Sequence, residues 1–223
     1  MKKNFMINFV VSVVVVFAAV VFVIANSAGI VHAELERYDF PKLEREKPVK
    51  LIFPKAPVLS AGEQDARRRN EAKRKSIAAL LQQYNKKLSD AKAHDYAGFI
   101  MQASEKFGQD PFVITAMVVN ESSVKHDAVS RGGDYGLMQV RWRVHQKKIR
   151  KKYPHIENAQ DMLNPQDNLL VGTEIFSTYH ATAKRNVRNA LMYYSAGNKR
   201  LADKVFAVLS KLEKSYLERL KNS

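Results

Sequence analysis

The chain has 223 residues, a formal net charge of +15 and no cysteine. Its length suits one domain with its own core plus appended segments, and the lack of cysteine excludes disulfides, thiolate metal sites, a cysteine nucleophile and a lipid anchor on cysteine. The excess of positive charge favours a polyanionic partner: nucleic acid, anionic lipid, or a cell wall rich in carboxylates and phosphates.

Residues 1–33 are predicted to be an export element. Lys2 and Lys3 precede an apolar run over residues 9–25, and Val31-His32-Ala33 offers the small residues that signal-peptide cleavage requires. The run is also long enough to span a bilayer, so a cleaved signal and a retained membrane anchor both stay open, and the cleavage motif favours the signal. Since the lysines stay inside in either case, we expect an exported protein, periplasmic or in the cell envelope.

Residues 34–62 are predicted to be a spacer of extended chain, because they combine charge with four prolines. Residues 63–92 are predicted to form one basic helix, with cations over residues 67–75 and then an apolar stripe from Ile77 to Tyr84. The cations would contact a polyanion or a membrane surface, or they form a solvated face of a helix that covers the following domain. The second interpretation is favoured.

The domain that follows, residues 93–223, opens with an amphipathic helix that Gly108 ends. A second helix is predicted from Pro111 to Ser122, with Asp110 as its N-cap. Glu121 extends the apolar face of this helix at its C-terminal end, where burial and the helix dipole would raise the pKa of its carboxyl group. A carboxyl group that stays protonated near neutral pH can act as a general acid. The alternative is a Glu121 at a fraying helix end, in solvent or paired with Lys125.

A polar loop containing Ser130 and a pair of glycines leads from this helix to the short apolar segment Gly136–Val140, which contains Gln139. A dense basic segment with the only tryptophan, Trp142, comes next. Basic residues around an aromatic ring are typical of nucleic-acid binding. Because these follow Gln139 directly, the lip of a saccharide groove is favoured instead.

A further helix is predicted from Asn164-Pro165, an N-cap followed by proline in the first turn. Gly172 lies on its apolar face and would let another helix approach closely. The segment Ala190–Gly197 contains Tyr193, Tyr194 and Ser195, of which Tyr193 is interpreted as simple packing. A last amphipathic helix over residues 199–223 would cap the domain, with Leu217 and Leu220 available to a partner.

Three short sequences in this order resemble the catalytic core of the lytic transglycosylases of the SLT type: Glu121-Ser122, Ala128-Val129-Ser130 and Gly136-Leu137-Met138-Gln139. The Asn164-Pro165 pair and Tyr194 extend the resemblance to about half of the chain. The chain departs from the family in two places, with Arg141-Trp142-Arg143 where a proline is usual and Ser195 where an asparagine is usual. The resemblance implies a mainly α, lysozyme-like domain with at most a small β element.

The resemblance also implies a reaction and a set of site residues. Glu121 would be the catalytic acid, and the bond between N-acetylmuramic acid and N-acetylglucosamine in peptidoglycan would be cleaved without water to give a 1,6-anhydro product. Ser130 and Gln139 would hold the sugar acetamide and line the groove, Tyr194 would position Glu121, and Ser195 would contact the sugar directly or through water. No cofactor is expected, and the histidines show no spacing typical of a metal site.

Three other functions stay open. A hydrolase of the goose-lysozyme kind would need a second carboxylate, which Asp127 or Asp134 could supply. A non-catalytic assembly factor would bind peptidoglycan in an inactive groove. A nucleic-acid binder, suggested by the charge alone, is the least favoured. The sequence also leaves open a secretion or conjugation apparatus as a partner, and cutting within strands against cutting from their ends.

Overall fold

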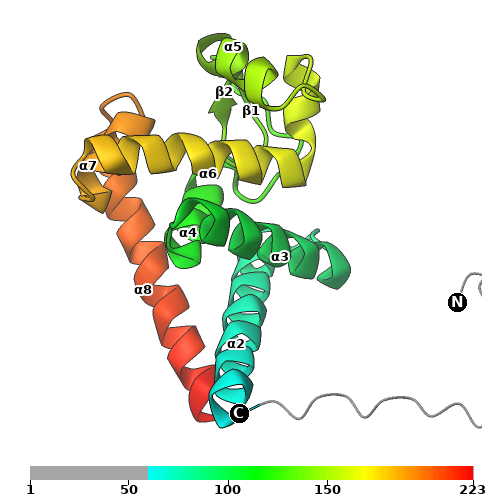
Figure 1. Cartoon of the computed structure of the whole chain (residues 1–223), viewed down its shortest axis with the longest axis vertical. Helices are drawn as coiled ribbons and strands as arrows, with labels where there is room; N and C mark the ends of the chain where they lie inside the picture. The colour runs from blue at the N-terminus through cyan, green and yellow to red at the C-terminus, as the bar shows by residue number, and fades with distance from the viewer. Residues whose placement is uncertain (1–59, 223) are drawn as a thin grey trace, which may run out of the picture. The chain divides into compact units, whose positions relative to one another are not determined.

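The computed structural model describes residues 60–222, so the predicted export element and all but the last three residues of the predicted spacer lie outside the described residues (Figure 1). Within that range the chain forms seven α-helices, one 3-10 helix and two short strands. In chain order they are α2 (Ala61–Tyr84), α3 (Asp90–Phe107), α4 (Pro111–Ser122), β1 (Asp134–Tyr135), β2 (Val140–Arg141), α5 (Trp142–Lys152), η2 (Ala159–Leu163), α6 (Pro165–Thr182), α7 (Val187–Tyr194) and α8 (Lys199–Lys221).

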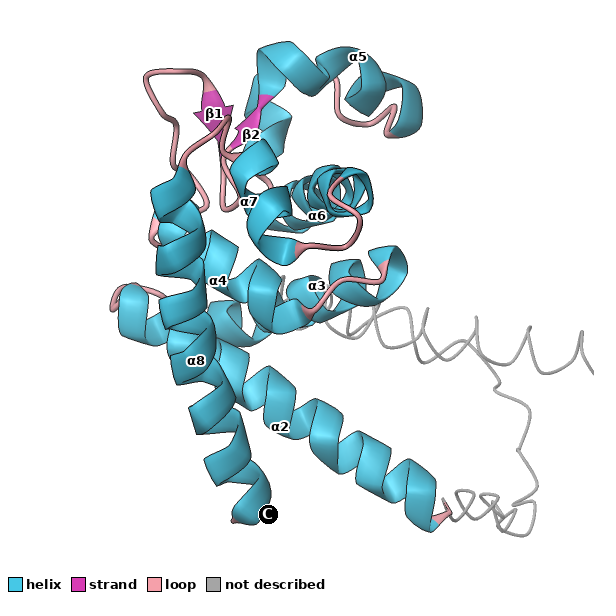
Figure 2. Cartoon of the chain, turned by 90° about the vertical axis from the view of Figure 1, so that its left-hand side faces the viewer, coloured by secondary structure: helices cyan, strands magenta, loops and turns pink. Residues whose placement is uncertain are grey.

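The expected mainly α fold with at most a small β element is confirmed. The described strands form one antiparallel pair, in which Asp134 lies opposite Arg141 and Tyr135 opposite Val140. Figure 2 shows this pair above α6, with α5 leading away from it, and β2 contacts both helices. None of the helices within residues 60–222 has both the length and the apolar character needed to cross a membrane.

The prediction of a single helix over residues 63–92 is wrong. Ser60 starts α2 earlier, through a capping box in which its hydroxyl accepts from the amide of Glu63 and the Glu63 carboxylate accepts from the amide of Ser60. The helix ends at Tyr84, and Ser89 caps a new helix by accepting from the amide of Lys92. The side chain of Ser89 accepts from a backbone amide and so starts a new helix, and this short-range hydrogen bond outweighs the helix-forming residues just before it.

The C-terminal half of α2 packs against the helices that follow it. Ile77, Leu80 and Leu81 are buried in the common core, and the helix packs against α3 and α8. The side chain of Asn85, just past its end, donates to the backbone oxygen of Val124 at 3.0 Å. The arginines at 67–69 are exposed, so the favoured interpretation of this segment, a solvated face on a covering helix, agrees with the packing.

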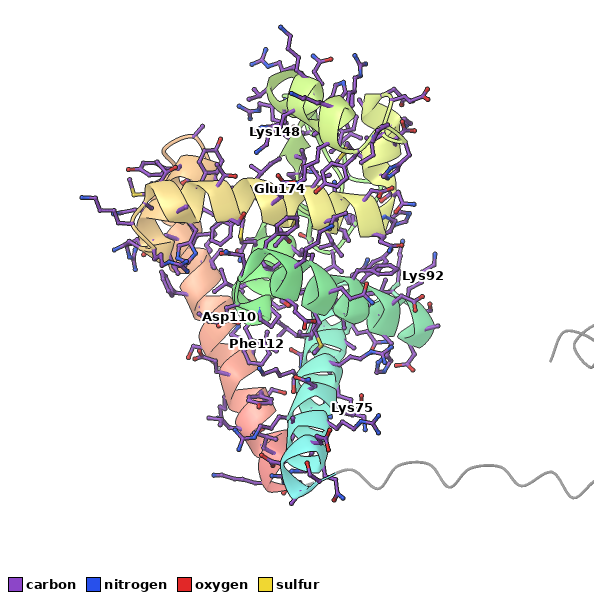
Figure 3. The ribbon with its side chains drawn as sticks, in the orientation of Figure 1. Lys75, Lys92, Asp110, Phe112, Lys148 and Glu174 are labelled. Atoms are coloured by element: carbon purple, nitrogen blue, oxygen red, sulfur yellow. The ribbon has the colours of Figure 1, made fainter. Side chains whose placement is uncertain are left out.

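Helix α4 lies at the centre of the packing and contacts α3, α8 and α2. Asp110 caps it as predicted, by accepting from the amide of Phe112 at 2.8 Å, and Pro111 occupies its first turn (Figure 3). Every residue from Phe112 to Val119 is buried. The helix is therefore buried on all sides, which the expectation of one apolar face did not anticipate.

Asn168 of α6 ties this helix to the segment that carries the Gly-Leu-Met-Gln motif. Its side chain is fully buried and makes three hydrogen bonds of 2.8 Å, accepting from the amide of Met138 and donating to the backbone oxygens of Tyr135 and Met162. Gly136 faces the same amide, and its φ of +73° together with an approach of 2.3 Å from Asn168 to a hypothetical Cβ leaves room only for glycine.

Gly172 permits a close approach, but not by a helix as predicted. The side chain of Met138 packs on it, and a Cβ added at Gly172 would lie 2.6 Å from the sulfur atom. Met138 is itself fully buried. Gly172 therefore makes space for the motif segment, because the side chain of Met138 occupies the volume that a side chain at position 172 would fill.

Helix α5 is held on α6 by a cluster of polar side chains. The carboxylate of Glu174 accepts from Lys152 at 2.8 Å and from the hydroxyl of Tyr153 at 2.6 Å, and Lys148 lies 3.7 Å away. Figure 3 labels Glu174 on α6 and Lys148 on α5. Because Ile149 is the only buried residue of α5, this cluster and β2 fix the position of the helix.

Helix α8 closes the unit, as expected from its apolar stripe. Leu201, Val205, Val208 and Leu212 are buried against the core, and the helix packs on α4 and α2. Leu217, proposed for a partner contact, is 55% exposed.

We expect Asn168→Ala to lower the free energy of unfolding by about 3 kcal/mol, because it removes three buried hydrogen bonds and leaves the amide of Met138 unpaired. Chemical denaturation followed by far-UV circular dichroism would measure this. Asn70→Ala on the exposed surface of α2 is the matched control and should change stability by less than about 0.5 kcal/mol. A loss at Asn168 no larger than that of the control would contradict the role assigned to this side chain.

Candidate active site

A cavity of about 500 Å³ opens beside the C-terminal end of α4. Its lining comes from α4, from the loop and strands that follow, and from α5, α6, α7 and α8. The lining residues are Asn120, Glu121, Ser130, Asp134, Gln139, Val140, Arg141, Val144, His145, Ile175, Tyr179, Tyr193, Tyr194, Ser195, Ala196, Asn198, Leu201 and Lys204. The structure therefore brings all five predicted site residues, Glu121, Ser130, Gln139, Tyr194 and Ser195, to one cavity.

Glu121 lies in the last turn of α4 and is partly buried. Burial, and secondarily the negative charge of Asp134, raise the pKa of its carboxyl group to about 7. The direction agrees with the sequence prediction, but the contribution of Asp134 was not foreseen. Glu121 is partly buried and forms no ion pair with any side chain within residues 60–222, so the alternative of Glu121 in solvent or paired with Lys125 is wrong.

Asp134 is the second carboxylate in the cavity, and the protein already binds both of its oxygens. Arg141 donates to them at 2.6 and 3.1 Å, and the hydroxyl of Ser130 donates to one of them at 2.9 Å. The hydrogen bond from Arg141 is the main reason that the pKa of Asp134 is lowered. The two carboxyl groups therefore differ in state: Asp134 is ionised and paired, whereas Glu121 can be protonated near neutral pH.

Ser130 holds the loop together. Besides donating to Asp134, its hydroxyl oxygen accepts from the amides of Gly132 and Asp134, both at 3.1 Å. One donor and two acceptor positions are all that a hydroxyl offers. Ser130 thus lines the cavity as predicted, but its hydrogen bonds are used within the loop.

Gln139 lies in the left-handed region with a φ of 49°. Its side-chain nitrogen donates to the backbone oxygens of Ala128 at 3.1 Å and Gly136 at 2.9 Å. Both amide hydrogens are used in this way, so the group left for a ligand is the side-chain oxygen, an acceptor. An acceptor in this position suits the N–H of a sugar acetamide.

Tyr194 donates its hydroxyl proton to the backbone oxygen of Met138 at 2.8 Å. Burial raises the pKa of this phenol, and the charge of Glu121 adds to the effect, so the two groups lie near each other as the family resemblance implies. Since its proton is committed to Met138, the phenol oxygen presents only lone pairs to the cavity. Lone pairs beside Glu121 favour the protonated form of that carboxyl group.

Ser195 lines the cavity from the turn after α7. Its hydroxyl lies 3.3 Å from the backbone oxygen of Met192 and 3.2 Å from that of Asn198, and donates within the turn. Its single hydrogen can serve only one acceptor at a time. Direct contact with a sugar through this hydroxyl would therefore compete with the hydrogen bonds of the turn.

The structure adds residues that the sequence did not single out. Tyr193 was interpreted as simple packing, and this is wrong, because its side chain is 47% exposed and lines the cavity. His145 and Lys204 line it too, from α5 and α8. The sequence did contain a signal for Tyr193. Adjacent residues of a helix point in different directions, so Tyr193 and Tyr194 cannot both pack in the same way.

Two predictions about neighbouring residues are corrected by the lining. Asp127, offered as a second carboxylate, does not line the cavity, whereas Asp134 does. Of the lysines and arginines in the basic segment after Val140, only Arg141 reaches the lining, so most of that segment is not the lip of this cavity. Within residues 60–222 no group of three or more histidine and acidic side chains could hold a metal ion.

The fold is mainly helical, and a partly buried carboxyl group lines an open cavity. The family model described as the transglycosylase SLT domain matches residues 98–216. The chain therefore belongs to the SLT transglycosylase family. The match includes every predicted site residue, and it assigns to the chain a lytic transglycosylase type of action on peptidoglycan glycan strands.

The raised pKa of Glu121 predicts a pH-dependent cost in stability. Between pH 4.5 and 7 the unfolded chain ionises Glu121 while the folded protein keeps it protonated, so stability falls as pH rises through this window. We expect Glu121→Gln to match the wild type in stability near pH 4 and to exceed it by up to about 3 kcal/mol at pH 8. Denaturant unfolding of both proteins at both pH values measures this comparison. If the variant and the wild type differed in stability by the same amount at pH 4 and at pH 8, the assignment of the raised pKa to Glu121 would be contradicted.

Proposed function

We propose that the protein is an exported lytic transglycosylase that cleaves the β-1,4 bond between N-acetylmuramic acid and N-acetylglucosamine without consuming water. The observation that carries this proposal is the contrast between the two carboxyl groups of the cavity. Glu121 has no protein partner within residues 60–222 and a pKa near 7, whereas both oxygens of Asp134 are bound by Arg141 and Ser130. One available carboxyl group supports a mechanism that needs only one.

In the first step Glu121 donates its proton to the glycosidic oxygen. The bond between that oxygen and C1 of the muramyl sugar breaks, and the N-acetylglucosamine side leaves with a hydroxyl at C4. The electron-poor C1 is stabilised by the acetamide of the same sugar, whose N–H the side-chain oxygen of Gln139 can accept. In the second step the C6 hydroxyl of the muramyl sugar attacks C1, and its proton passes to the Glu121 carboxylate. This closes the 1,6-anhydro ring and restores the protonated Glu121.

Tyr194 acts through Glu121 in this scheme. Its ring packs edge-on against Phe176 and Tyr179, with centroids 6.3 and 6.2 Å away, and its hydroxyl is bound to Met138. These contacts hold the phenol oxygen in one place. A fixed oxygen with only lone pairs can accept from the protonated acid and orient its proton.

Hydrolysis to a reducing end is the second candidate, because Asp134 does line the cavity. It would require Asp134 to act as the base for water, yet Arg141 and Ser130 bind both of its oxygens and lower its pKa, which makes it a weak base. Digestion of purified sacculi, with the muropeptide ends identified by mass spectrometry, separates the two reactions. Anhydromuramyl ends support the proposal, and reducing ends support the hydrolase.

The proposed location rests on two observations. The sequence begins with a basic and then strongly apolar segment typical of export, and peptidoglycan lies outside the cytoplasmic membrane. We propose a periplasmic or envelope location, with the segment cleaved or kept as an anchor. Cell fractionation, with the mass of the mature chain, would distinguish a processed protein from an anchored one.

We expect Glu121→Gln to lower turnover of purified sacculi by at least about a hundredfold, because the amide has no proton to donate to the leaving oxygen. In the wild type, kcat/KM should fall as pH rises through about 7, where Glu121 loses its proton. Pelleting with sacculi should show that the variant still binds. Undiminished turnover in Glu121→Gln would contradict the role of Glu121 as the acid, whereas a wild type that binds sacculi without cleaving them would support a non-catalytic peptidoglycan-binding factor.

The pair of Asp134 and Arg141 should set the alkaline limit of activity. We expect Arg141→Met to move the fall in kcat/KM to higher pH, because the unpaired charge of Asp134 would hold the proton on Glu121 more strongly. Asp134→Asn should move it to lower pH. Lys147→Met is the control, since it removes one exposed cation of α5 outside the cavity lining. Shifts of the same sign in the first two variants would contradict the electrostatic argument.

A further inference from the structure

The charged side chains that line the cavity leave one charge unbalanced. Asp134 and Arg141 neutralise each other, and burial keeps Glu121 in its neutral form up to about pH 7. Burial, together with the nearby Lys148 and Arg141, lowers the pKa of His145, which is therefore neutral at the same pH. Lys204 is the remaining charged residue of the lining.

Lys204 lies on α8, one turn after Leu201, which also lines the cavity. Its side chain is exposed and forms no ion pair with any residue in the range 60–222. The adjacent acid, Asp203, is paired with Arg188 instead. Tyr193 and Asn198 line the cavity together with it, so this part of the lining combines a cation, an exposed aromatic ring and an amide.

An unpaired cation at a sugar-binding cavity has a chemical counterpart in only one of the two sugars of peptidoglycan. N-acetylglucosamine is neutral. The muramyl sugar carries a lactyl group at O3, which bears a carboxylate when it is free and, when a stem peptide is attached, is followed by the carboxylates of that peptide. A lysine ammonium is a strongly hydrated point charge on a flexible stem and can reach acceptors in several positions.

We propose that Lys204 binds a carboxylate of the muramyl substituent. The inference rests on the proposed function, because it takes peptidoglycan as the ligand. Lys204 would then be a specificity residue, because its ammonium group would favour muramyl-containing strands over a neutral glycan. Since Lys204 is exposed and screened by solvent, its effect on affinity is modest.

The test measures binding rather than turnover. Glu121→Gln serves as the host protein, so that glycans stay intact, and Lys204→Met, Lys204→Arg and Lys211→Met are made in it. Lys211 is exposed on the same helix, two turns further along and outside the cavity lining, and is the control for net charge. Isothermal titration at low salt uses a neutral N-acetylglucosamine oligomer, peptide-free muramyl strands and peptide-bearing muramyl strands.

We expect Lys204→Met to weaken binding of a muramyl strand about threefold to fivefold and to leave the neutral oligomer unaffected. Lys204→Arg should retain the affinity, and Lys211→Met should match the host. A loss confined to peptide-free strands supports the inference with the lactyl carboxylate as the source, and a loss on peptide-bearing strands supports it with the stem peptide as the source.

Equal losses on all three glycans, or no loss on either muramyl strand, would overturn the inference. These outcomes are distinct from failure of the proposed function, which would appear as persistent turnover in Glu121→Gln with an otherwise wild-type chain. The circular dichroism spectrum and melting temperature of each variant check folding, which the exposure of Lys204 makes easy to preserve.

Discussion

The three hydrogen bonds of the buried Asn168 side chain hold the active-site segment in place. They connect α6 to Tyr135 and Met138, on either side of the turn that contains Gly136. Once Met138 is fixed, its backbone oxygen is in position to accept from Tyr194. A segment of a few residues has too little apolar surface to fold by itself, so a buried amide that satisfies its backbone groups determines its conformation. The arrangement of acid, phenol and cavity depends on that contact.

The electrostatics of the cavity follow from unequal treatment of two carboxyl groups. Asp134 accepts hydrogen bonds from both Arg141 and the hydroxyl of Ser130. Glu121 is instead partly buried and lies near the negative charge of Asp134. Pairing stabilises the ionised form of the first, and desolvation stabilises the neutral form of the second. Arg141 neutralises the charge of Asp134 and thus limits how far that charge raises the pKa of Glu121. It stands immediately before Trp142, in the stretch where this chain departs from the usual family pattern.

Local patterns predicted the helices best where capping residues were present. Asp110-Pro111 and Asn164-Pro165 marked the starts of α4 and α6, and Gly108 marked the end of α3. The boundary between α2 and α3 was missed although Ser89 is also an N-cap, because no proline follows it to mark the first turn of the helix. The prediction of a single apolar face on α4 was also wrong, because a helix that contacts three others is apolar on every side. The position of Glu121 on one face of this helix therefore could not by itself show that the residue lies beside a cavity.

The sequence by itself determined the helical class, the family and five of the residues that meet at the cavity, because these depend on short motifs in a fixed order. Only the tertiary structure decided which of their polar atoms are available to a ligand. The hydroxyl of Ser130 is used in hydrogen bonds within the loop, and the hydroxyl of Tyr194 donates to Met138. Tyr193 and Lys204, in contrast, line the cavity. Hydrogen-bond capacity is shared among residues that folding brings together from distant parts of the chain, and a linear pattern does not contain that allocation.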